Sequence, residues 1–207
     1  MNYLIETERL RLRPFTLADL PVLRTMRAKE EVARYLGTSA LQTPEFVASR
    51  LGVYLECYER YGFAVAGVEE RSASGKLIGW GGLMPLELGW NGKEAPADPR
   101  AAVIEVGYGF DTPHWGKGYA TEVAAAWLRY GFEYAGLPRI VAVASPENKG
   151  SWRVMEKLGM RYEGTEEHYG SVCVVYAITR AEFGAPSRAG AFRVLPYNSE
   201  ETRGGDE

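Results

Sequence analysis

The chain has 207 residues, which is enough for one domain with a full hydrophobic core. Its composition, 46% hydrophobic and 25% charged, is typical of a globular protein, and its formal net charge of -3 argues against a dedicated nucleic-acid binder. The two cysteines, Cys57 and Cys173, form neither a disulfide framework nor a zinc-ligand pattern, so no metal site is predicted.

The N-terminus lacks a basic region followed by an apolar stretch, which argues against a signal peptide. No apolar run approaches the roughly 18 residues that a membrane-spanning helix needs. These features predict a cytoplasmic protein without a membrane partner.

The spacing of apolar residues and of turn residues divides the chain into short elements. In chain order, it predicts a strand (9–13), two helices (about 16–28 and 43–62), two strands of a hairpin (63–68 and 77–83), a loop (85–100), a strand (102–110), a long helix ending at 135, a strand (139–144), a short helix (about 150–158) and two final strands (about 160–166 and 172–179). Strict alternation in residues 9–13 predicts that their arginines face solvent. Thr16 and Asp19 form a pair similar to a capping box.

This order of elements predicts an α+β domain around one mixed sheet. Residues 139–144 are expected to run parallel to residues 102–110, because a long helix joins the two strands. From Gly184 onward the chain is small, polar and charged. It is therefore predicted to be a flexible tail (184–207) behind a domain of residues 1–183, although docking of residues 192–197 stays open.

Between the strand 102–110 and the long helix lies the sequence Trp115-Gly116-Lys117-Gly118-Tyr119-Ala120-Thr121. Glycines at a strand-to-helix junction expose backbone N–H groups at the positive end of a helix, which suits a phosphate. The spacing fits neither a P-loop nor a dinucleotide fingerprint, whose third glycine is replaced here by Thr121. From these residues alone, a simple tight turn into the helix also stays open.

Further features favour a ligand site at this junction. Gly107 and Gly109 weaken the preceding strand, which is typical of a bulge or a close backbone approach. Asn148 and Ser151 begin the helix after the next parallel strand, at the same edge of the sheet, although ordinary N-capping also explains them. Positive side chains surround that helix start, or form its solvated face: Lys149, Arg153 and Lys157.

Three blocks in this order resemble the GNAT acetyltransferases of the type that includes the ribosomal-protein N-terminal acetyltransferases. They are residues 7–13, residues 105–108 with 115–122, and residues 148–151 with 157–160, and the resemblance covers about residues 3–183. It implies a single GNAT-like domain, with a mostly antiparallel twisted sheet of about six to seven strands and about four helices. A splayed parallel pair of strands is expected at the cofactor site.

The resemblance implies acetyl-CoA as the cofactor. The backbone amides of Gly116, Lys117, Gly118, Tyr119 and Ala120 would hold the CoA pyrophosphate, and Gly109, Phe110, Asp111 and Thr112 would pair with the pantetheine arm. Asn148 resembles the family asparagine that contacts this arm. Trp115, Thr121, Ser151 and Arg153 complete the predicted cofactor site, with Trp115 standing where the general family pattern has Gln or Arg.

Acetyl transfer to an amine needs a base, an oxyanion donor and help for the leaving thiolate. Glu105, on the strand expected to pair with pantetheine, is the candidate base, although a structural carboxylate is equally compatible with the sequence. Ser151 resembles the serine proposed as the acid, and a strand N–H is the natural oxyanion donor. Glu163, Glu166, Glu167 and His168 form a second set of bases, and His114 precedes the glycine loop. Cys57 and Cys173 are interpreted as core residues, which favours direct transfer in a ternary complex.

The acceptor is an amine, either a protein N-terminus or a small molecule, and the residue types do not choose between them. The first two helices with residues 34–36, the loop 85–100 with Trp90 and residues 91–94, and Trp80 are expected to wall its pocket. A non-catalytic acyl-CoA-binding module is the alternative function, and a nucleotide enzyme is a third. The chain is expected to be a monomer or a homodimer.

Overall fold

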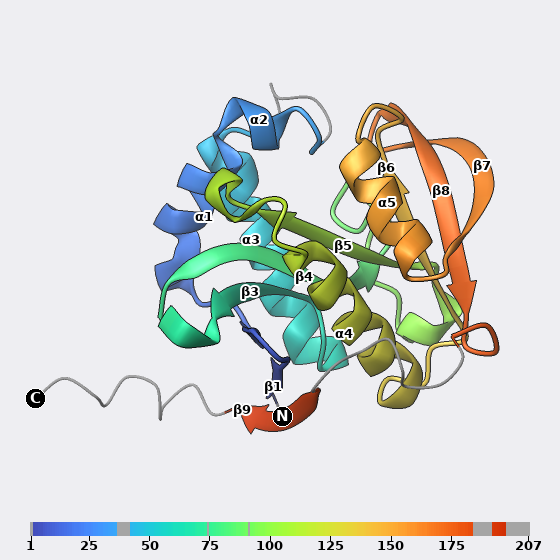
Figure 1. Cartoon of the computed structure of the whole chain (residues 1–207), viewed down its shortest axis with the longest axis horizontal. Helices are drawn as coiled ribbons and strands as arrows, with labels where there is room; N and C mark the ends of the chain where they lie inside the picture. Colours follow the sequence, from blue (N-terminus) through green and yellow to red (C-terminus); the bar gives the residue numbers. More distant parts are fainter. Residues whose placement is uncertain (1, 37–41, 74, 91, 184–191, 198–207) are drawn as a thin grey trace, which may run out of the picture.

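A single nine-stranded sheet, in the order β7-β8-β6-β5-β4-β3-β2-β1-β9, runs through the computed structural model (Figure 1). The structure describes residues 2–36, 42–73, 75–90, 92–183 and 192–197. The strands are β1 (Asn2–Glu6), β2 (Leu10–Arg13), β3 (Val65–Glu70), β4 (Leu77–Pro85), β5 (Ile104–Phe110), β6 (Arg139–Ala144), β7 (Arg161–His168), β8 (Ser171–Thr179) and β9 (Arg193–Tyr197). The α-helices are α1 (Leu20–Arg27), α2 (Glu30–Ala33), α3 (Pro44–Tyr61), α4 (Tyr119–Glu133) and α5 (Lys149–Lys157).

The α+β class and all seven expected strands are confirmed, and the four expected helices correspond to α1, α3, α4 and α5. The sequence missed two strands at one edge of the sheet, β1 and β9. The register of this antiparallel pair runs from Asn2↔Tyr197 to Glu6↔Arg193. The flexible-tail prediction therefore does not hold for Arg193–Tyr197, and the docking that the sequence left open for residues 192–197 occurs instead, because β1 offers backbone groups to which this segment adds as a strand. The rest of the tail, 184–191 and 198–207, lies outside the described residues.

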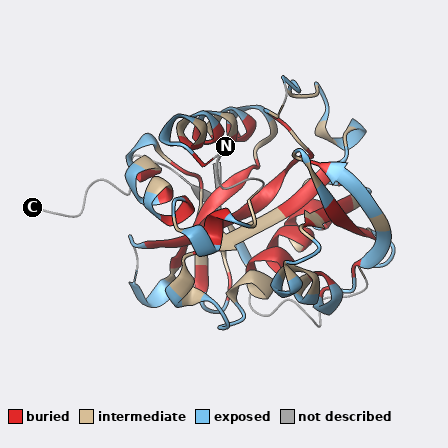
Figure 2. Cartoon of the chain, turned by 90° about the horizontal axis from the view of Figure 1, so that it is seen from above, coloured by how far each residue is buried: buried red, intermediate tan, exposed pale blue. Residues whose placement is uncertain are grey.

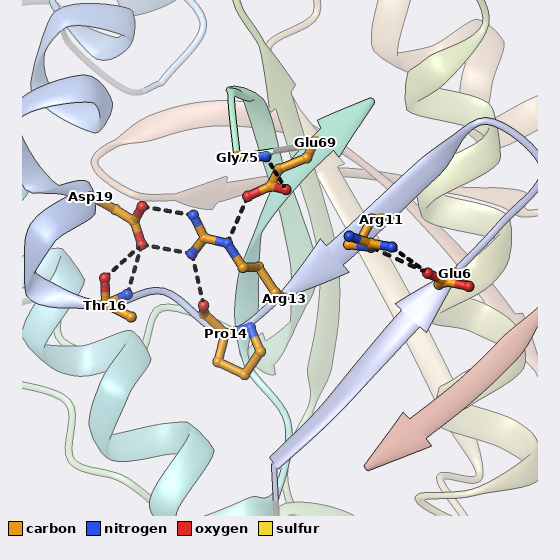
Figure 3. A network of polar contacts seen from close by, with 8 residues as sticks. All are labelled: Glu6, Arg11, Arg13, Pro14, Thr16, Asp19, Glu69 and Gly75. Carbon is orange, nitrogen blue, oxygen red and sulfur yellow. Dashed lines mark hydrogen bonds and ion pairs between the residues drawn. The ribbon is translucent and has the colours of Figure 1, made fainter. Parts of the chain in front are cut away.

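The arginine at the end of β2 corrects another expectation. The side chain of Arg13 is only 16% exposed, and its two Nη groups donate to the Asp19 carboxylate at 2.8 Å each (Figure 3). Its Nε donates to Glu69 at 2.7 Å, and Glu69 also accepts from the Gly75 N–H at 2.9 Å. A charge this well paired is tolerated away from solvent. The network ties β2 to the turn before α1 and to the β3–β4 connection.

Helices cover the two faces of the central strands, which are buried (Figure 2). On the α4 face, Gly81 and Gly131 permit close packing: a Cβ on Gly81 would lie 2.4 Å from Val123 of α4. Successive residues of a strand alternate between faces, so Trp80 and Met84 of β4 point away from α4. Both contact arginines of α1 and α3, which identifies the second face. Among the described residues, no helix has the length and apolarity needed to cross a bilayer.

The parallel strands β5 and β6 separate after a short contact. Their register contains only Ile104↔Ile140 and Glu105↔Val141, although β5 continues to Phe110 and β6 to Ala144. Each strand stays paired on its other side, β5 with β4 and β6 with β8. The expected splayed pair is therefore confirmed, and beyond Glu105 β5 turns a backbone edge without a described partner strand toward the gap.

Candidate active site

The loop between β5 and α4 has a backbone that only glycine adopts easily. Gly116 has φ 75° and Gly118, the N-cap of α4, has φ 80°, both in the left-handed region. A Cβ on Gly116 would meet no protein atom within 4 Å, so the space beside it is open. The Trp115 indole N–H donates to the Phe110 carbonyl at 2.7 Å and holds the loop against the end of β5. The loop therefore presents bare backbone at a positive helix end.

A clamp from the distant β1–β2 turn holds this loop in place. The Glu122 carboxylate, in the first turn of α4, accepts from the Thr7 hydroxyl at 2.6 Å and from the Arg9 backbone N–H at 2.9 Å. The Arg9 guanidinium pairs with Glu122 at 2.7 Å and donates to the Lys117 carbonyl at 2.8 Å. The sequence did not indicate that residues 7–13 and 115–122 contact each other, and these hydrogen bonds give the physical reason for their association.

One cavity of about 720 Å³ joins the glycine loop to the space beside α1 and α3. Most of the predicted cofactor residues line it: Gly109, Phe110, Trp115, Gly116, Gly118, Tyr119, Ala120, Thr121, Asn148, Ser151 and Arg153. Asp111, Thr112 and Lys117 are not among its described lining residues. The Asp111 carboxylate instead pairs with Lys29 and accepts from the Thr112 N–H at 2.8 Å, so its side chain has a structural use.

The start of α5 meets β5 across the splay. Asn148 caps the helix, with its side-chain oxygen accepting from the Ser151 N–H at 3.1 Å, as the capping interpretation of the sequence expects. The Tyr108 hydroxyl lies 3.0 Å from the Ser151 hydroxyl and donates to the Ser151 carbonyl at 3.2 Å. Burial raises the pKa of Tyr108 to about 12, so the phenol stays protonated. Sequence reasoning did not select Tyr108 among 13 tyrosines, because only the fold brings it to Ser151.

Glu105 lies at the last paired position before β5 and β6 separate, and it lines the cavity. It is 8% exposed, and this burial raises its pKa to about 7, against the opposing effects of the Tyr169 hydrogen bond and the Arg50 charge. The Tyr169 hydroxyl donates to Glu105 and accepts from the Glu87 N–H at 3.0 Å. A carboxylate with this pKa can exchange a proton near neutral pH.

The second set of candidate bases lies elsewhere. Glu163 pairs with Arg139, Glu166 and Glu167 are exposed on β7, and His168 is buried with its Nε2 3.1 Å from Glu166. None of these four belongs to the described lining of the cavity. His114 does line it, and its Nδ1 lies 3.4 Å from a Glu70 oxygen.

Both cysteines are buried, as the sequence predicts. Burial raises the pKa of Cys57 to about 11 and also raises that of Cys173, so both remain thiols. Cys173 nevertheless borders the cavity, a position that the sequence did not indicate.

At the other end of the cavity, the walls come from the segments expected to form an acceptor pocket. Tyr35, Leu36, Phe46, Trp80 and Trp90 line it, together with Arg27 of α1 and Arg50 of α3. Lys93 and Glu94 are not among its described lining, and Asn91 lies outside the described residues.

Comparison with known proteins agrees with this geometry. The family model of the acetyltransferase (GNAT) domain matches residues 9–161. The chain is 32% identical over 166 residues to the uncharacterized N-acetyltransferase YoaA of Bacillus subtilis, a match that covers 80% of this chain and 87% of YoaA. Its structure resembles a GNAT-family acetyltransferase from Bacillus anthracis, with a TM-score of 0.65, 29% identity, and coverage of 86% of this chain and 99% of the other.

A second similar structure is Mycobacterium smegmatis RimJ in complex with CoA-disulfide, with a TM-score of 0.66 and coverage of 87% of this chain and 88% of RimJ. Its identity of 20% supports the shared fold alone. The match to the family model and the 32% identity to YoaA also show the family of the chain. The chain therefore belongs to the GNAT family of acetyltransferases, enzymes that use acetyl-CoA, as its motifs predict.

Proposed function

We propose that the protein transfers the acetyl group of acetyl-CoA to a primary amine, by direct attack within a ternary complex. The observation that carries this proposal is the position of Glu105: a buried carboxylate with a pKa of about 7, where β5 and β6 separate, in the cavity that also contains the glycine loop. An amine is a nucleophile only when neutral, and a base with this pKa is suited to accept its proton, directly or through water.

The cavity fits acetyl-CoA. Backbone N–H groups at Gly116 and Gly118 and the N-terminus of α4 suit the pyrophosphate, and the edge of β5 that has no described partner strand suits the pantetheine amides. When bound, acetyl-CoA supplies the thioester that the amine attacks. The hydroxyls of Ser151 and Tyr108 form a hydrogen-bonded pair that can stabilise the departing sulfur. Because the pKa of Tyr108 is about 12, this phenol donates without losing its proton.

A thiol-release assay with acetyl-CoA and a panel of primary amines, including ribosomal-protein N-terminal peptides, tests this function. We expect acetyl-CoA-dependent release of CoA with at least one class of amine, and a matching N-acetyl product by mass spectrometry. Tight binding of acetyl-CoA without turnover on any amine would instead favour a non-catalytic acyl-CoA-binding module.

We expect removal of the loop clamp to weaken the binding of acetyl-CoA and to change the rate of the chemical step little. Glu122→Ala deletes the acceptor of the Thr7 and Arg9 hydrogen bonds. Charge-assisted hydrogen bonds of this kind contribute about 1.5–3 kcal/mol each. The KM for acetyl-CoA should rise about tenfold or more, while kcat at saturating acetyl-CoA changes little.

The matched control for this variant is Glu133→Ala, in the last turn of the same helix, which removes only a pair with Arg129. Steady-state kinetics in acetyl-CoA distinguish the two changes. Equal KM values in the two variants would contradict a clamp.

A further inference from the structure

Two arginine side chains are buried at the acceptor end of the cavity, and no carboxylate among the described residues is in hydrogen-bonding contact with either. Arg27 is 6% exposed and Arg50 is 7% exposed, and both line the cavity. Within the described residues, neither guanidinium forms an ion pair or a hydrogen bond with a carboxylate.

The contacts that Arg27 makes are with neutral groups. Its Nε donates to the Gln42 side-chain oxygen at 2.9 Å, and its guanidinium lies 5.3 Å from the centre of the Trp80 ring. Its guanidinium also donates to the Tyr54 hydroxyl, a neutral group. Burial lowers the pKa of Arg27, which reflects the cost of a charge removed from water.

Arg50 is held in a similar way. It donates to the Leu88 carbonyl, and its Nη2 lies 3.3 Å from the Met84 sulfur. Its guanidinium also lies 5.3 Å from the ring centre of Tyr54. Burial raises the pKa of the Tyr54 hydroxyl, but the positive charges of Arg50 and Arg27 lower it below its usual value. The two arginines therefore create a shared positive field around Tyr54.

The two arginines lie beside the reacting strand. Trp80, under Arg27, is the register partner of Gly109, and Met84, beside Arg50, is the partner of Glu105. These positions bracket the part of β5 that separates from β6. A small molecule whose amine reaches Glu105 therefore also lies close to the two guanidinium groups.

The positive charge of this part of the cavity predicts which ionised group such a molecule should carry. A buried charge is costly unless it is paired, and guanidinium groups pair most strongly with planar oxyanions. Two guanidinium charges against one ionised Glu105 leave one positive charge, which a monoanion balances. A polycationic amine would bring further positive charge to the same place.

We propose that Arg27 and Arg50 bind a carboxylate of the acceptor, so that the enzyme acts on amines that also carry a carboxylate group. This inference rests on the proposed acetyltransferase function for its description of the ligand as an acceptor. The anion site itself can be tested without turnover.

The binding test compares two probes of the same shape and different charge. 3-Phenylpropionate and its neutral amide, 3-phenylpropanamide, are titrated calorimetrically into the protein saturated with CoA. We expect the acid to bind about 10- to 100-fold more tightly than the amide. Equal affinities, including no measurable binding of either, would overturn the proposal.

Variants assign the effect to the arginines. Arg27→Gln should reduce the acid-to-amide ratio to about one, and Arg27→Lys, which keeps the charge but loses the planar fork, should give an intermediate ratio. Arg60→Gln, an exposed arginine of α3 outside the cavity, should leave the ratio unchanged. A ratio that stays at the wild-type value in Arg27→Gln would contradict the assignment.

The stability of an Arg27 variant distinguishes a ligand-binding role of this arginine from a structural role. Arg27→Met replaces a buried charge that has no carboxylate partner among the described residues by an apolar side chain, so its unfolding midpoint in denaturant should equal or exceed that of the wild type. A structural arginine would instead leave a less stable protein. A large loss of stability in Arg27→Met would therefore count against the proposal.

Turnover measurements distinguish failure of the carboxylate-site proposal from failure of the proposed acetyltransferase function. Acetylation is compared between L-phenylalanine and L-phenylalaninamide, and between β-alanine and its amide. If amides are acetylated as well as acids, the acetyltransferase proposal stands and the carboxylate site falls. If no amine is acetylated but the acid probe binds selectively through Arg27, the anion site stands and the proposed transfer falls.

Discussion

Replacing Glu105 by glutamine is expected to lower kcat by about 10²- to 10⁴-fold, because the neutral amide cannot accept the proton of the attacking amine. In the wild type, the rate should rise with pH as Glu105 ionises and level off above its pKa of about 7. In Glu105→Gln this acidic limb should disappear. Initial rates of CoA release across this pH range, with an amine of low pKa, measure the difference.

The exposed Glu167, also on a strand, supplies the control: Glu167→Gln should keep both the rate and the acidic limb. The groups facing Glu105 that affect its titration are Tyr169, Arg50, His168 and Glu87. An acidic limb that survives unchanged in Glu105→Gln would assign the base elsewhere.

The same carboxyl should make stability depend on pH. Its pKa is raised from 4.5 to about 7 in the folded protein, so between these values the folded state binds more protons than the unfolded state. Protonated Glu105 therefore adds up to about 3 kcal/mol to the free energy of unfolding below about pH 4.5. This contribution is lost as the pH rises toward 7. Glu105→Gln should remove this contribution in denaturant unfolding followed across that range.

Substituting Gly116 by alanine is expected to weaken acetyl-CoA binding about 10- to 100-fold, because several backbone hydrogen bonds to phosphate depend on this turn. The new Cβ would project into the open space beside the loop, and the left-handed backbone adds about 1–2 kcal/mol of strain. The measurement is the dissociation constant of CoA or acetyl-CoA by calorimetry.

Gly75→Ala is a matched control for the strain. Gly75 has φ 87° and open space around its would-be Cβ, but it lies in the β3–β4 connection, outside the cavity. Both variants should lose similar stability, and only Gly116→Ala should lose affinity for the cofactor. Similar affinities for CoA in the two variants would contradict a role of the loop in binding phosphate.

The sequence by itself determined the parts that local chemistry controls. Alternation and helical periodicity predicted the seven strands β2 to β8 and four helices, because these patterns follow from the directions in which a strand and a helix point successive side chains. Gly116 and Gly118 marked the candidate phosphate-binding loop because few other residues adopt a left-handed turn. Glu105 followed from the resemblance to a family.

Only the tertiary structure decided which distant side chains meet. Glu122 contacts Thr7 across 115 positions of the chain, and β1 (Asn2–Glu6) pairs with the distant β9 (Arg193–Tyr197). Arg27 and Arg50 resemble ordinary helix-surface arginines in the sequence. Whether such a charge is solvated or buried depends on what packs against its helix, and no local pattern records that.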